Sequence, residues 1–172
     1  LYGLDADLFH LALASHEKHI VLFRQDEIKM TAGKPGSNAV STFIQVDIER
    51  LRQYILLEYQ PVFDNYPEID LSALNFRILD DWVFMNFVIG NDFVGETPKC
   101  IHISGEMHSN FKPDDIGTLT KLHVKLLLDQ GQDLKFLAKG KVTLETLIDN
   151  GQIQFPIFIK FLKLLESNYN KL

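Results

Sequence analysis

The stretch ILDDWVFMNFVIGNDF, residues 78–93, decides how this chain folds. Apolar residues occupy nearly every face of it before the glycine, which predicts a helix that is buried on most sides. Asp80 or Asp81 is expected to cap the start of this helix, and Gly90 to stop it. A buried helix that ends in a Gly-Asn-Asp turn would deliver Asp92 at its exposed end. That position favours Asp92 as a ligand, although an Asn-Asp pair also forms ordinary turns.

A second acidic motif lies in LYGLDADLF, residues 1–9, where Asp5 and Asp7 flank one alanine. Two close carboxylates repel each other unless a positive group offsets them, and the nearest downstream cations are Lys18 and Arg24. On a strand, residues i and i+2 point to the same side, so both carboxylates could meet at a strand end, where α/β sheets bind ligands. Oxygen ligands of this kind suit Mg²⁺. The alternative interpretation is a turn and helix cap, with Asp7 accepting backbone N–H groups.

Composition limits the function classes. The chain has 172 residues, 46% of them hydrophobic, which is enough for the core of one domain. Its net charge of −6 argues against a chain that is nucleic-acid surface throughout, but not against an acidic metal site within a larger basic enzyme. The single cysteine, Cys100, excludes an intrachain disulfide and favours an intracellular location. No secretory pattern or membrane-spanning stretch is evident. Because the chain begins at Leu1 and not at methionine, we expect a piece of a longer protein.

The order of elements predicts an α/β class, with a central, mostly parallel sheet flanked by helices and a helical C-terminal part. Strands are expected over residues 1–4, 19–24, 41–46 and 100–104. Helices are expected over residues 7–15, 78–90 and 114–129. A further helix is expected to start with Asp47 as its N-cap, and a last one at the C-terminus with Pro156 in its first turn. Residues 29–38 are expected to form a surface loop, and residues 60–76 a long connection without regular structure.

Two other enzyme classes use a D-x-D motif. Haloacid-dehalogenase-type phosphatases want Thr or Val two residues past the second aspartate, where this chain has Phe9, and a lysine between their motifs that does not stand out here. Glycosyltransferases hold a nucleotide-bound metal with D-x-D, but no sugar-nucleotide signature accompanies it. Both are therefore weaker interpretations than a metal site of another kind.

Several further residues have both an ordinary and a functional interpretation. Histidines without a cysteine at ligand spacing favour surface or capping roles over a zinc site: His10, His16 and His19, and likewise His102 and His108. Trp82 could stack a base, but inside so apolar a helix it is expected in the core. The lysines of the C-terminal half predict a solvated face, with contact to an RNA backbone as the alternative: Lys112, Lys121, Lys125, Lys135, Lys139 and Lys141.

Taken together, these segments resemble the XRN family of 5′→3′ exoribonucleases, which belongs to the flap-endonuclease-like nuclease superfamily. The resemblance rests on four stretches: LYGLDADLF at 1–9, FIQVDIERLRQYILLEY at 43–59, GQIQFPIFIKFLKLLE at 151–166 and, above all, DDWVFMNFVIGNDF at 80–93. It covers most of the chain and is weakest over 95–112. It implies the later part of the family's catalytic region, with residues 1–93 bearing metal ligands and residues 94–172 mostly helical.

The resemblance implies a metal-dependent nuclease that hydrolyses RNA from a 5′-monophosphate end, processively, to mononucleotides, in RNA decay or processing. By residue match, Asp5, Asp7 and Asp92 are ligands of a two-metal site for Mg²⁺ or Mn²⁺, completed by residues outside this chain. The implied partners are RNA and the rest of the parent nuclease domain, with no membrane, in the cytoplasm or the nucleus. Metal charge would then offset the repulsion between Asp5 and Asp7.

The chain also departs from the family pattern. The family follows GNDF with Leu-Pro, whereas here VGETP follows. The family's other acidic ligands, its basic pocket for the 5′-phosphate and most of its stacking aromatics lie upstream of Leu1, so the chain alone is expected to be inactive. The alternative is a degenerate family member that acts as an RNA- or protein-binding scaffold. The presence of all three aspartates argues against that alternative.

Overall fold

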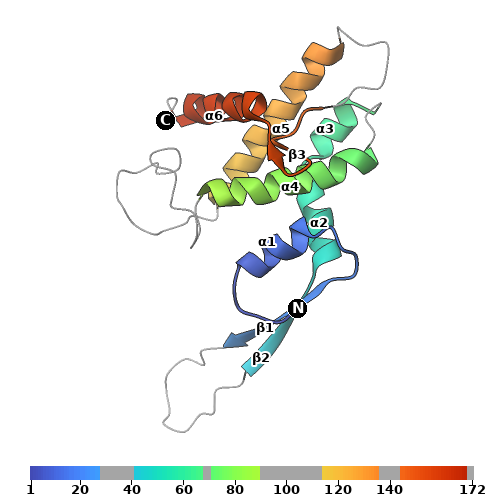
Figure 1. The fold of residues 1–172 in the computed structure, drawn as a ribbon, viewed down its shortest axis with the longest axis vertical. Helices are drawn as coiled ribbons and strands as arrows, with labels where there is room; N and C mark the ends of the chain where they lie inside the picture. The colour runs from blue at the N-terminus through green and yellow to red at the C-terminus, as the bar shows by residue number, and fades with distance from the viewer. Residues whose placement is uncertain (28–40, 68–70, 90–113, 136–143, 170–172) are drawn as a thin grey trace. The chain divides into compact units, whose positions relative to one another are not determined.

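The computed structural model describes five stretches of the chain: residues 1–27, 41–67, 71–89, 114–135 and 144–169 (Figure 1). The chain divides into two compact units, Leu1–Tyr54 and Ile55–Leu172. The predicted boundary at residue 93 falls outside the described residues and stays a prediction. The same holds for the loop predicted over 29–38 and for the strand predicted over 100–104.

The first unit is built on a two-stranded antiparallel sheet. Strand β1 (Val21–Glu27) pairs along its whole length with β2 (Ser41–Asp47). The strand expected over residues 1–4 is reduced to a single parallel bridge between Tyr2 and Phe23, supported by the Gly3 N–H donating to the Phe23 carbonyl at 3.1 Å. The first residues of the chain are thus held in register beside β1, and the chain then turns into α1 (Asp7–Ala14).

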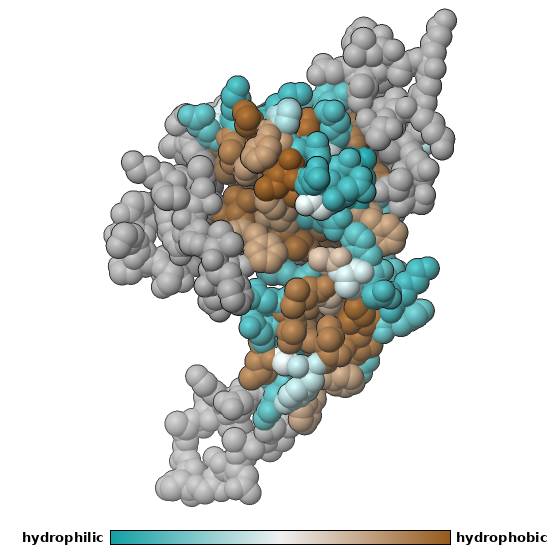
Figure 2. All heavy atoms as spheres, in the orientation of Figure 1, coloured by the Kyte–Doolittle hydropathy of each residue, from teal (hydrophilic) through white to brown (hydrophobic). Residues whose placement is uncertain are grey.

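The two faces of this sheet differ. Leu22 is fully buried. Tyr2, Phe23 and Phe43 are large exposed residues, and the strand register puts all three on the face opposite Leu22. Figure 2 shows apolar residues, in brown, at the surface of the described part of the chain. The three side chains are between 44% and 65% exposed.

Helix α2 (Ile48–Leu57) begins as the sequence predicted. The Asp47 carboxylate accepts the backbone N–H groups of Glu49 at 2.9 Å and Arg50 at 3.3 Å, which is N-cap geometry. Arg52 of the same helix is buried and donates to the carbonyls of Ala12 and Glu17. These bonds fix the end of α1 against α2.

The second unit is helical. It contains α3 (Gln60–Asn65), α4 (Leu71–Ile89), α5 (Asp114–Lys135) and α6 (Phe155–Tyr169), with the short antiparallel hairpin of β3 (Ile148–Asp149) and β4 (Gln152–Ile153) before α6. Apolar side chains of α4, α5 and α6 form a core together with Leu147, which directly precedes β3: Met85, Ile89, Leu119, Leu122, Leu126, Leu147, Ile157, Phe161 and Leu165. Trp82 packs against this core, as expected. Pro156 lies in the first turn of α6, as predicted.

Two local expectations were wrong. Helix α4 begins at Leu71, so Asp80 and Asp81 lie in its interior and neither caps its start. Residues 60–76 are not an irregular connection, because they hold α3, with Pro61 in its first turn, and the start of α4. The described part of α4 ends at Ile89, and the predicted stop at Gly90 lies outside the described residues and stays a prediction.

The described part of the chain is mixed α/β and mostly helical. Its two sheets are antiparallel hairpins, with one parallel bridge beside β1. The α/β class is therefore confirmed, whereas the central, mostly parallel sheet is not observed among the described residues. None of the helices in those residues combines the length and apolar character that crossing a membrane requires.

Candidate functional site

The Asp5–Asp7 motif forms a turn and not the end of a continuous strand. Asp5 Oδ1 accepts the backbone N–H of Asp7 at 3.1 Å, and Asp7 is the first residue of α1. The accepting carboxylate is therefore that of Asp5 and not, as the alternative interpretation had it, that of Asp7. A negative charge in the first turn of a helix is favourable because the helix dipole is positive there. The turn, and not the pleat of a strand, sets how the two carboxylates lie.

Both carboxylates reach solvent. Asp5 is exposed, and the Asp7 side chain is about a quarter exposed, with Oδ1 lying 3.7 Å from Nδ1 of His10. Two accessible carboxylates are the protein share that Mg²⁺ commonly takes, with waters and substrate phosphate supplying its other ligands. The donor set thus suits a hard divalent cation. Asp92, the third predicted ligand, lies outside the described residues, as do His102 and His108.

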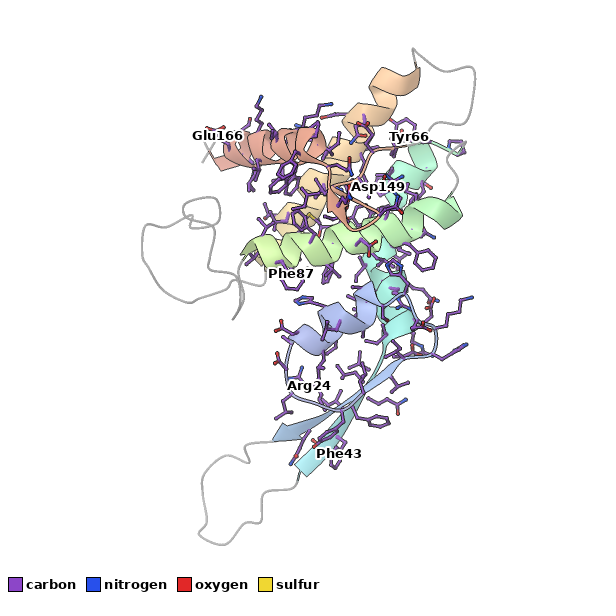
Figure 3. All side chains as sticks on the ribbon, in the orientation of Figure 1. Arg24, Phe43, Tyr66, Phe87, Asp149 and Glu166 are labelled. Carbon is purple, nitrogen blue, oxygen red and sulfur yellow. The ribbon has the colours of Figure 1, made fainter. Side chains whose placement is uncertain are left out.

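Arg24 reaches this turn from β1. Its Nη2 donates to the carbonyl of Leu4 at 3.3 Å, and its guanidinium carbon lies 5.9 Å from the centroid of the Phe9 ring (Figure 3). Leu4 directly precedes Asp5, and Phe9 lies two residues past Asp7. The sequence identified Arg24 only as one of the nearest downstream cations, 17 positions beyond Asp7. The hairpin fold is what brings it to the motif.

No group of three or more histidine, cysteine or acidic side chains gathers as a metal site within the described residues. His16 and His19 lie in the loop after α1 with positive φ angles of 55° and 63°, a conformation that histidine adopts more readily than most residues. The zinc site weighed for His10, His16 and His19 thus has no support among the described residues.

A buried polar network lies in the second unit, and the sequence did not predict it. Asp81, His123 and Tyr59 are all fully buried. The Tyr59 hydroxyl lies 2.9 Å from His123 Nδ1, and His123 Nε2 lies 3.0 Å from Asp81 Oδ2, a contact outside hydrogen-bond geometry. The Asp81 carboxylate also accepts the backbone N–H groups of Leu147 at 2.8 Å and Ile148 at 2.7 Å.

This network links α4 to α5 and to the segment before α6. It also changes the acidity of Tyr59: burial, then the negative charges of Asp81 and Glu58, raises the pKa of Tyr59 well above its ordinary value. A second link joins α4 to β3, where Arg77 Nη2 lies 3.4 Å from Asp149 Oδ1 (Figure 3). A buried acid in an apolar helix needs partners, and Asp81 carried that signal in the sequence.

The known proteins to which the chain is similar are nucleases. No family model matches the chain. The chain is 30% identical over 167 residues to 5′-3′ exoribonuclease 1 of Homo sapiens, which covers 94% of the chain and 8% of that protein. It is 36% identical over 100 residues to 5′-3′ exoribonuclease 2 of Yarrowia lipolytica, covering 58% of the chain and 9% of the relative. The match to 5′-3′ exoribonuclease 1 of Saccharomyces cerevisiae is 37% identical over 108 residues, covering 60% and 7%.

The similarity to the 5′→3′ exoribonuclease family that the sequence motifs indicated is therefore confirmed. The chain spans about a tenth or less of the length of these relatives.

Proposed function

We propose that this chain is part of a metal-dependent 5′→3′ exoribonuclease that hydrolyses 5′-monophosphorylated RNA processively to mononucleotides. The observation that carries the proposal is the similarity to a 5′-3′ exoribonuclease over 94% of the chain. The structure adds two accessible carboxylates, Asp5 and Asp7, at the start of a helix whose far end is fixed by Arg52.

In this proposal Asp5, Asp7 and Asp92 hold Mg²⁺ or Mn²⁺ together with acidic residues elsewhere in the parent protein. When bound, such ions supply positive charge at the scissile phosphate and activate water for in-line attack. The protein's own part is to hold the carboxylates in position. The Asp7 N–H holds Asp5 Oδ1, and the first turn of α1 favours the charge of Asp7.

The proposed partners are the RNA substrate and the rest of the parent nuclease domain. Tyr2, Phe23 and Phe43 support the second of these, because exposed aromatic residues gathered on one sheet face are typical of a surface that packs against more protein. The proposed location is intracellular, in the cytoplasm or the nucleus.

The proposal is tested with the full-length protein and RNA in Mg²⁺. Asp5→Asn, Asp7→Asn and Asp92→Asn should each reduce hydrolysis at least a hundredfold, while chelation of the metal abolishes it. Glu166→Gln, which neutralises an exposed carboxylate on α6, is the matched control and should keep wild-type activity. Wild-type rates in all three aspartate variants would overturn the metal-ligand assignment. The absence of hydrolysis by the wild-type protein would favour the scaffold alternative.

A further inference from the structure

Arg24 contacts the acidic turn on both sides. Its guanidinium donates to the carbonyl of Leu4, the residue before Asp5. It also lies over the ring of Phe9, two residues after Asp7. The acidic turn, residues 5–7, thus lies between two contacts of one side chain. A small shift of Arg24 would therefore displace the chain at both ends of the turn.

The backbone that carries Arg24 is well fixed. Arg24 lies opposite Ile44 in the β1–β2 pairing, and its neighbour Phe23 pairs with Tyr2 on the other side of β1. The Phe23 N–H donates to the Leu1 carbonyl at 2.9 Å, and the Phe23 carbonyl accepts the Gly3 N–H. Main-chain hydrogen bonds therefore hold residues 1–3 beside β1, and the bond from Arg24 to the Leu4 carbonyl continues this attachment up to the turn.

The chemistry of the turn explains why an arginine suits this position. Asp5 and Asp7 repel each other before any metal binds, so the turn that carries them needs a firmly held backbone. A planar guanidinium can also donate along a fixed direction and stack on an aromatic ring at the same time, which the point charge of a lysine does less well.

We propose that Arg24 is a positioning residue for the metal-binding carboxylates of Asp5 and Asp7. The inference rests on the proposed function and deepens it. Arg24 contacts the backbone and a ring beside the carboxylates, so its effect is on their geometry and on the affinity for the ion. Loss of such an outer contact to a metal site typically lowers metal affinity about tenfold or more.

The test is Mn²⁺ binding to the full-length protein, measured by the electron paramagnetic resonance signal of free Mn²⁺. Arg24→Lys keeps the charge and removes the planar group, so it isolates geometry from electrostatics. It should weaken Mn²⁺ binding about tenfold. Arg50→Gln, which neutralises an exposed arginine on α2, is the control and should bind as the wild type does. Wild-type Mn²⁺ affinity in Arg24→Lys would overturn the inference.

A second variant guards against misfolding. Phe9→Leu keeps Arg24 and removes only the ring beneath it, and it should also weaken Mn²⁺ binding, by a smaller factor. Circular dichroism tests whether each variant is folded. If Arg24→Lys unfolds and Phe9→Leu binds Mn²⁺ as the wild type does, the inference is wrong.

The two proposals fail in different ways. Wild-type protein that hydrolyses RNA, together with unchanged Mn²⁺ affinity in both variants, overturns the role of Arg24 alone. Wild-type protein that binds Mn²⁺ but does not hydrolyse RNA overturns the proposed function, and the Mn²⁺ titrations still decide the role of Arg24. Wild-type protein that binds no Mn²⁺ overturns both.

Discussion

Replacing Asp81 with alanine should lower the free energy of unfolding by about 3–5 kcal/mol, the loss measured when one partner of a buried charged contact is removed. Asp81 is fully buried, and its carboxylate accepts two backbone N–H groups, from Leu147 at 2.8 Å and from Ile148 at 2.7 Å. Each hydrogen bond to a charged group contributes about 1.5–3 kcal/mol, so the two bonds alone account for this loss. Alanine would also leave the buried N–H groups of Leu147 and Ile148 without this acceptor.

The assay is urea unfolding of the protein followed by circular dichroism. With a urea dependence of about 2 kcal/mol per molar, the midpoint should fall by about 1.5–2.5 M. Asp81→Asn keeps the shape but turns an amide N–H toward backbone donors, so its midpoint should also fall, by less. Asp129→Asn, an exposed acid on α5, is the control and should change stability by less than about 0.5 kcal/mol. An Asp81→Ala midpoint as close to the wild type as that of the control would refute the structural role of Asp81.

Three further predictions concern stability. Asp47→Ala removes the acceptor at the start of α2 and should cost about 1 kcal/mol, seen as a lower urea midpoint, whereas Asp47→Ser should retain most of the capping energy. Gly131→Ala should destabilise the protein by about 1–3 kcal/mol, because a methyl group there would collide with the Tyr66 ring. Gly117→Ala, at a position with open space, is the control and should not destabilise the protein. Equal melting temperatures for the two variants would contradict this packing. Stability should fall above pH 10. Burial, then the charges of Asp81 and Glu58, raises the pKa of Tyr59 in the folded protein above its unfolded value of 10.0. The contribution of the protonated Tyr59 to the free energy of unfolding is therefore complete below pH 10 and is lost as the pH rises through the pKa of the folded state. Tyr59→Phe should flatten that fall in urea midpoints, and an unchanged alkaline profile would exclude Tyr59 as its source.

Contacts between near neighbours in the chain could be predicted from the sequence. Asp47 was identified as an N-cap because its partners lie two and three residues away. The place of Pro156 in the first turn of α6 was predicted from an equally local rule.

Contacts between distant residues could not be predicted in this way. Asp81 was assigned to a helix start because an acid before an apolar run usually caps one, yet its partners are 66 and 67 residues further on. The backbone N–H groups of those partners satisfy the Asp81 carboxylate inside the helix, in place of the free N–H groups at a helix start. In the same way, Arg24 meets Leu4 across twenty residues, a distance that only strand pairing closes. The aspartate motif was evident from residue identity, and a turn there was the alternative interpretation, but the accepting carboxylate is that of Asp5 and not that of Asp7.

The most direct test of the proposed function is a single RNA, prepared with either a 5′-monophosphate or a 5′-hydroxyl and incubated in Mg²⁺ with the full-length protein. The proposal predicts that only the monophosphate RNA disappears, and that mononucleotides form without intermediates of decreasing length. Equal degradation of both RNAs, internal cleavage fragments, or survival of both would contradict a 5′→3′ exoribonuclease that requires a 5′-monophosphate.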